Sequence, residues 1–131
     1  MNTLAINNPT NYHDEQKKQN ILKMREILET LPHFCKDYFR GIEHYTSART
    51  RLAYAYDLRV FFEFMHKNNP ECAKQEITEF PITLLDQITR SDILEYLDYV
   101  SYYKKEDLEI TNEERGKSRK ISSLRSFYRY F

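Results

Sequence analysis

The sequence predicts an all-α protein, a small bundle of four to five helices with no sheet. Only two glycines and four prolines occur among 131 residues, so the turn residues that join many short strands are scarce. Several long segments repeat apolar residues at helical spacing, and none alternates apolar and polar residues over a sustained stretch. A chain of this length can bury one modest core, which predicts one domain.

The N-terminal region is expected to hold a lead followed by two helices. Residues 1–13 are rich in asparagine and show no apolar repeat, which predicts a disordered lead. The first amphipathic helix is expected over about 14–30, and Pro32 ends it. A shorter helix is expected over 34–42, interrupted at Gly41.

The segment 45–67 predicts the core helix. Its apolar residues recur at the spacing of a buried stripe, namely Tyr54, Leu58, Phe61, Phe62 and Met65. Its first turn combines hydroxyls and cations, namely Ser47, Arg49, Thr50 and Arg51. Free N–H groups and the helix dipole favour phosphate at such a start, so this turn is a candidate contact with a nucleic-acid backbone. Simple N-capping with solvated arginines is the commoner explanation for any single turn of this kind.

A long surface connection with two prolines is expected over 68–85. The next helix begins at Thr89, because Asp92 three positions later approximates a capping box. Its exposed face carries Glu95 and Asp98, so we expect that face to point away from any phosphate.

The last sixteen residues, 116–131, contain no acidic residue although the whole chain has a formal charge of zero. An acidic connection over 105–114 precedes them. Six cations fall within fifteen positions: Arg115, Lys117, Arg119, Lys120, Arg125 and Arg129. The zero net charge therefore hides a polarised surface.

A basic last helix is expected over about 117–131, with an apolar stripe that includes Leu124 and Phe127. Short hydroxyls between arginines let a helix approach a phosphate chain closely, and guanidinium groups bind phosphate or a guanine edge. The candidate DNA-contact residues here are Lys117, Arg119, Lys120, Ser122, Ser123, Arg125, Ser126 and Arg129. From this helix alone, a solvated basic face on an ordinary amphipathic helix is an equally good interpretation.

Taken in order, these motifs resemble the N-terminal core-binding, SAM-like domain of the tyrosine recombinases, the phage-integrase and Xer-like family. The resemblance covers roughly residues 31–131, within a helical domain expected over 14–131. The matching residues are Thr46, Ser47, Thr50, Tyr54, Asp57-Leu58 and Phe61-Phe62, then Ile88-Thr89, Asp92-Ile93 and Tyr96-Leu97, then the run from Arg119 to Tyr128.

The resemblance implies a helical bundle that clamps one face of double-stranded DNA, as half of a C-shaped enzyme that works as a DNA-bound tetramer of recombinase protomers. The family's catalytic residues belong to a C-terminal domain that is not present in this chain. Tyr128 and Tyr130 lie in the wrong domain to be the nucleophile, and packing is their expected role. We therefore expect no enzymatic activity, cofactor or small-molecule substrate for this chain alone.

Other chemistries find little support in the sequence. The four histidines and two cysteines lack the spacing of a metal site, and two glycines cannot form a phosphate-binding loop. No segment has the length and apolar character of a membrane span, and none resembles a secretory signal. We expect a cytoplasmic protein without a bound metal.

Two further functions stay open. A helical protein-interaction module could mate its acidic and basic faces with partner subunits, and the zero net charge favours it slightly. A helix-turn-helix regulator ranks last, because the segment 104–116 before the basic helix is longer than the turn of that motif.

Overall fold

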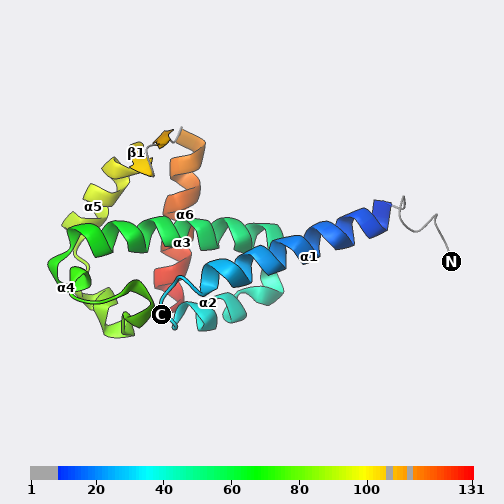
Figure 1. Cartoon of the computed structure of the whole chain (residues 1–131), viewed down its shortest axis with the longest axis horizontal. Helices are drawn as coiled ribbons and strands as arrows, with labels where there is room; N and C mark the ends of the chain where they lie inside the picture. Colours follow the sequence, from blue (N-terminus) through cyan, green and yellow to red (C-terminus); the bar gives the residue numbers. More distant parts are fainter. Residues whose placement is uncertain (1–8, 106–107, 112–113) are drawn as a thin grey trace.

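The computed structural model describes residues 9–105, 108–111 and 114–131. Its helices are α1 (Pro9–Leu28), α2 (Cys35–Gly41), α3 (Ala48–Asn68), α4 (Pro70–Ala73), α5 (Arg90–Tyr99) and α6 (Glu114–Tyr130), with short 3-10 turns η2 (Glu43–Tyr45), η3 (Ile77–Glu79) and η4 (Ile82–Gln87). Two short strands, β1 (Tyr102–Lys105) and β2 (Leu108–Thr111), lie between α5 and α6. The prediction of a small all-α bundle is confirmed (Figure 1).

Helix α3 runs through the middle of the bundle, and the other helices are arranged around it (Figure 1). Its stripe of Leu58, Phe61, Phe62 and Met65 is almost fully buried, whereas Tyr54 is only partly covered. The start is capped as the sequence predicts, because the Ser47 hydroxyl accepts a hydrogen bond of 3.1 Å from the Thr50 backbone N–H.

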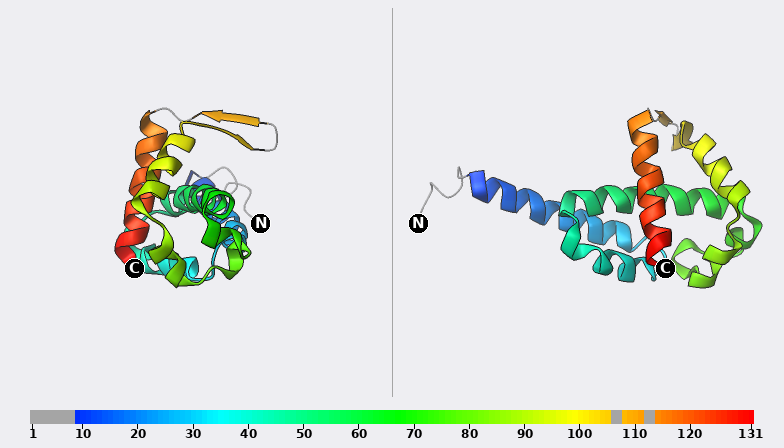
Figure 2. Two further views of the ribbon diagram at one scale, coloured as in Figure 1. Left: turned by 90° about the vertical axis from the view of Figure 1, so that its left-hand side faces the viewer. Right: turned by 180° about the vertical axis from the view of Figure 1, so that it is seen from behind.

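Helix α1 begins at Pro9, five residues before the predicted start, so the prediction of a disordered lead is wrong for residues 9–13; residues 1–8 lie outside the described range. Proline suits the first turn of a helix, because it has no N–H to leave unsatisfied and its φ is already helical. The C-terminal half of α1 packs on α3 and includes the buried Ile27, while the N-terminal half extends beyond the bundle (Figures 1 and 2).

The region between α3 and α5 is better organised than a surface connection. Phe80, Leu84 and Leu85 are buried in the core. The predicted capping box of α5 is present in both directions: Thr89 N–H donates to Asp92 Oδ2 at 2.9 Å, and Asp92 N–H donates to Thr89 Oγ1 at 3.1 Å. The same carboxylate accepts a bond of 3.0 Å from the Asn69 amide, which ties α5 to the end of α3.

The prediction of no sheet is wrong in one place, because β1 and β2 pair antiparallel with Tyr102 opposite Thr111 and Lys105 opposite Leu108. Aromatic and β-branched residues in the two segments favour extended backbone, and pairing satisfies those backbone groups of each strand that face the other strand. The hairpin projects sideways from the helical bundle (Figure 2). Four-residue strands are too short to show a sustained alternation in the sequence.

Candidate nucleic-acid interface

Helix α6 crosses α3 steeply near the middle of α3 (Figures 1 and 2). It begins at Glu114, three residues before the predicted start of the basic helix. Its inward face buries Leu124 and Phe127, and Phe127 packs edge-to-face on Tyr38 and Phe62 at ring-centroid distances of 5.2 and 5.9 Å. The cations and hydroxyls of α6 are divided between this face and the opposite one.

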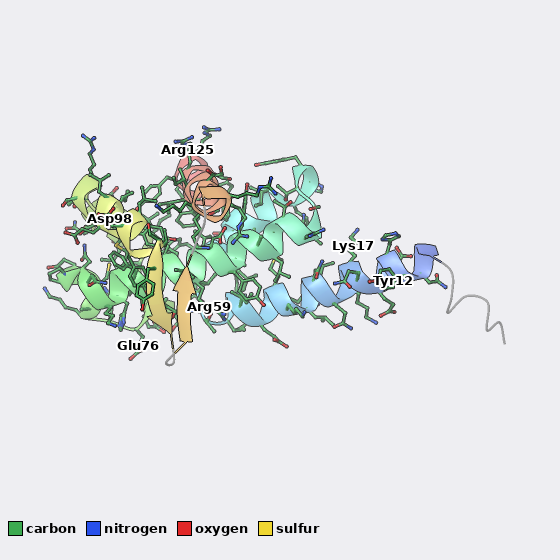
Figure 3. All side chains as sticks on the ribbon, turned by 90° about the horizontal axis from the view of Figure 1, so that it is seen from above. Tyr12, Lys17, Arg59, Glu76, Asp98 and Arg125 are labelled. Carbon is green, nitrogen blue, oxygen red and sulfur yellow. The ribbon has the colours of Figure 1, made fainter. Side chains whose placement is uncertain are left out.

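The outward face of α6 carries a stripe of exposed polar side chains, which we call the arginine stripe: Arg115, Ser118, Ser122, Arg125 and Arg129. The spacing of three, four, three and four residues keeps all five on one side of a helix. No aspartate or glutamate occurs between residues 115 and 131. Figure 3 shows Arg125 pointing away from the bundle on the α6 side.

Two other predicted contact residues of α6, Arg119 and Lys120, bind an internal carboxylate instead. The side chain of Asp57 on α3 is only 1% exposed. Arg119 grips it with two hydrogen bonds, Nε to Oδ2 at 3.1 Å and Nη2 to Oδ1 at 2.7 Å, and Lys120 Nζ lies 3.3 Å from Oδ1. Lys120 is itself 7% exposed, whereas Arg119 is 49% exposed at the flank of the stripe. Lys120 is therefore a core residue rather than a surface cation.

Two predicted serines are also used internally. Ser123 is buried, and its hydroxyl donates a hydrogen bond of 2.9 Å to the Lys120 carbonyl. The Ser126 hydroxyl shares a hydrogen bond of 2.8 Å with the hydroxyl of the buried Tyr38 on α2. Burial raises the pKa of Tyr38 to about 12, although the bond to Ser126 acts in the other direction. Of the three predicted serines on α6, Ser122 is the exposed one.

The candidate contact residues at the start of α3 are likewise divided between the interior and the surface. Arg51 is 6% exposed, and its guanidinium donates to the Glu43 carbonyl at 3.0 Å and also to the carbonyl and hydroxyl of Thr46. It therefore holds the turn that precedes α3. Ser47 and Arg49 are exposed, and the hydroxyl of the half-buried Thr50 accepts a bond of 2.9 Å from Ser47.

An open hollow of about 620 Å³ lies between α1 and the start of α3. Lys17 and His13 of α1 line it together with Arg49, which brings a cation from the first helix beside the start of the third. Lys17 is labelled in Figure 3. No local pattern in the sequence joins these two segments, because they are separated by more than thirty positions.

The structure thus suggests Arg115, Ser118 and Lys17 as further candidate contact residues. It also shows that Asp57 is the partner of the predicted contact residues Arg119 and Lys120. A signal for Asp57 exists in the sequence. It lies beside Leu58 within the buried stripe of the core helix, and a carboxylate there needs cationic partners from elsewhere in the fold.

Within the residues that the structure describes, no group of three or more histidine, cysteine, aspartate or glutamate side chains could hold a metal ion. No helix in that part of the chain combines the length and apolar character needed to cross a membrane.

Comparison with known proteins gives concordant matches. Residues 36–131 match the model of the family described as phage integrase, N-terminal SAM-like domain. The chain is 33% identical over 115 residues to tyrosine recombinase XerC of Caldanaerobacter subterraneus subsp. tengcongensis, which covers 83% of this chain and 30% of that relative. It is 38% identical over 88 residues to tyrosine recombinase XerC of Leptospira interrogans, covering 67% of this chain and 22% of that relative.

The chain therefore spans less than a third of the length of these relatives. No solved structure matches it at a comparable level of significance. The ordered motifs in the sequence, the helical bundle and the family match all agree. The chain belongs to the phage integrase N-terminal SAM-like domain family.

Proposed function

We propose that this chain is the DNA-binding, core-site domain of a tyrosine site-specific recombinase or integrase. The observation that carries the proposal is the arginine stripe. Three exposed arginines and two exposed serines share one face of α6, with no carboxylate in 115–131, in a chain that belongs to the phage integrase N-terminal SAM-like family.

The stripe has dimensions that suit a duplex. Arg115 and Arg129 are fourteen residues apart, which is about 21 Å along a helix axis. That length lies within one turn of B-DNA, which is about 34 Å. Arginine side chains at both ends and at Arg125 can bind phosphates, while Ser118 and Ser122 leave room for the helix to approach.

A second contact lies at the start of α3. Ser47, Arg49 and Thr50 lie at its first turn, where the helix dipole favours an anion, and Lys17 of α1 lines the same hollow as Ser47 and Arg49. With Lys117 at the other flank of α6, these residues complete the proposed DNA surface. Arg51, Lys120 and Ser123 are buried and are left out of it.

The strand-exchange chemistry of the family belongs to a separate domain, so the proposed role of this chain is to hold DNA rather than to cut it. Its proposed partners are double-stranded DNA and other recombinase protomers assembled on that DNA. We propose a cytoplasmic location for this function, in keeping with the bacterial source of the relatives.

The test is the binding of the chain to a fluorescent mixed-sequence duplex, followed by anisotropy across a salt series. Engagement of about six phosphates, by the three arginines of the stripe together with Lys17, Arg49 and Lys117, predicts a slope of log K against log salt of about −5. The variant Arg125→Ala/Arg129→Ala should weaken binding on the order of tenfold at low salt and reduce the size of the slope by about 2.

The matched control is Lys67→Ala/Lys74→Ala, which removes two exposed cations near the far end of α3. It should bind almost as the unmodified chain does, and circular dichroism should show equal helicity for all three proteins. Equal losses in both variants would mean that net charge rather than the stripe attracts DNA. No binding by the unmodified chain at low salt would favour the protein-interaction module.

A further inference from the structure

Asp57 has an unusual position for a carboxylate. It lies on the face of α3 that α6 crosses, with its side chain 1% exposed, and it accepts hydrogen bonds from two consecutive residues of α6, Arg119 and Lys120. Burying an ion is costly, and a buried ion pair often gives no more stability than apolar residues of similar volume. The contribution of this cluster is therefore to the geometry of the fold rather than to its stability.

We propose that Asp57 is a positioning residue for the arginine stripe: it fixes the rotation of α6 about its own axis, and so the direction in which the stripe points. This inference rests on the DNA-binding function proposed above. Asp57 itself is buried and does not reach DNA.

The crossing of the helices explains why a rotational lock is needed. Helices that cross steeply touch over a short length, so lengthwise packing of side-chain ridges does little to fix how α6 is turned (Figures 1 and 2). Apolar contacts at Leu124 and Phe127 are strong but non-directional. A directional contact at the crossing prevents α6 from rotating about its own axis.

The Asp57 cluster provides such a contact. Arg119 and Lys120 leave α6 about 100° apart, and both reach the same carboxylate. The two parallel bonds from Arg119 match the fixed fork of the guanidinium and tolerate little rotation. The bond between Ser126 and Tyr38 fastens the same helix again, seven residues further on.

The contacts with Asp57 also fix the direction of the arginine stripe, because Arg119, Lys120 and the stripe all belong to one rigid helix. Arg115 and Ser122 lie four residues before and three residues after Arg119, so each is an immediate neighbour of Arg119 on the helix surface. Turning α6 enough to break the Asp57 contacts would swing the arginines toward one edge of the bundle.

If only net charge determined DNA affinity, two variants would bind DNA in the opposite order to the one that the proposal predicts, so the proposal can be tested. The critical variant is Asp57→Asn/Lys120→Met, which removes one negative and one positive charge and leaves no buried ion unpaired. Its partner is Lys120→Met, which keeps the pair between Arg119 and Asp57 but lowers the net charge by one. Asp57→Asn alone leaves a buried lysine without its carboxylate. This variant is less useful, because an unpaired buried charge strongly destabilises the folded state.

DNA affinity is measured in the anisotropy assay described above. If Asp57 positions the stripe, the double variant binds DNA on the order of tenfold more weakly than the unmodified chain, and more weakly than Lys120→Met. If only charge matters, the order is reversed, because Lys120→Met has the lower net charge. That reversed order, or a double variant that binds more tightly than the unmodified chain, would overturn the proposal.

A second readout does not depend on DNA. Nitroxide labels are placed on Ser122→Cys in α6 and Lys67→Cys near the end of α3, both exposed positions, and pulsed EPR measures the distance between them. The native thiols of Cys35 and Cys72 are buried, and burial raises the pKa of both, so they react slowly with the label.

The label distance should be narrowly distributed in the unmodified background and in Lys120→Met, and broadened or shifted in Asp57→Asn/Lys120→Met. An unchanged distribution in the double variant would refute the positioning role whatever the DNA result. If the unmodified chain binds no DNA, the proposed function fails, and the label distances alone then decide whether Asp57 orients α6.

Discussion

The ring of Tyr130 occupies the space that a side chain at Gly41 would need. A Cβ atom built on Gly41, the last residue of α2, would lie 2.3 Å from Cε1 of Tyr130 and 2.9 Å from Cζ. Such distances are far shorter than a normal contact, so Tyr130 can keep this ring position only because residue 41 is glycine.

Gly41→Ala should therefore lower the free energy of unfolding by about 1 kcal/mol, because the Tyr130 ring must move away. The effect is moderate because Tyr130 is 43% exposed and has room to turn. In a Tyr130→Ala background the sign should reverse, because alanine is the better helix former by roughly 0.5–1 kcal/mol. Urea unfolding of the four proteins measures both effects. Additive changes would show that the two residues do not compete for space.

Alkaline pH should destabilise the protein from about pH 9 upward. Burial raises the pKa of Cys72 to about 11 and of Tyr38 to about 12, above the ordinary values of 9.0 and 10.0. The folded protein therefore keeps protons that the unfolded chain has lost, so stability falls as pH rises, by about 1.4 kcal/mol per pH unit for each such group.

Tyr38→Phe isolates one of these groups. It should flatten the loss of stability between about pH 10 and 12, and it should cost about 1 kcal/mol at pH 7 because Ser126 loses its hydrogen-bond partner. Urea unfolding at intervals from pH 7 to 11 gives both values. An identical pH slope in the variant and the unmodified protein would contradict the assignment to Tyr38.

Arg49 and Arg51 are two residues apart but should respond differently to substitution. Arg51→Met leaves the carbonyls of Glu43 and Thr46 without their donor and should cost about 2 kcal/mol of stability. Arg49→Ala should change stability by less than about 0.5 kcal/mol, because Arg49 is exposed, and should weaken DNA binding. Thermal unfolding and anisotropy on both variants test this, and similar stability losses in the two would argue against it.

Phe127 is the residue of α6 whose loss should cost most stability. It is fully buried and its ring packs on those of Phe34, Tyr38 and Phe62. Phe127→Ala should cost about 3–5 kcal/mol, a large part of the stability of a small domain. Phe131→Ala, at the exposed end of the same aromatic cluster, is the control and should cost much less. Chemical unfolding of both variants compares the two positions.

The features that the sequence predicted correctly are local ones. The cap at Ser47, the capping box of Thr89 and Asp92, and the stripe from Leu58 to Met65 each follow from residues within a few turns of one another. The helix class follows from the same repeats. The early start of α1 is not predicted because its first turns show no apolar repeat, and this part of the helix extends beyond the bundle (Figure 1).

Which of the candidate contact residues lie at the surface was only partly predictable, because that depends on residues far away in the sequence. Arg119 and Lys120 look like surface cations until Asp57, more than sixty positions earlier, is brought against them. Arg51 likewise finds its acceptors in the turn before α3. Tertiary packing determines whether a cation faces solvent or a buried acceptor, so local sequence repeats cannot predict it.

The crossing of α6 over α3 has a consequence for how a duplex could be held. Ser47 and Asp57 are ten residues apart, which is about 15 Å along α3, and the major groove of B-DNA is about 12 Å wide. The point where α6 crosses α3 thus lies about 15 Å from the start of α3, a separation comparable with the distance between the two phosphate walls of one groove. A duplex held at both walls cannot roll about its own axis, so the same base edges would always face the protein.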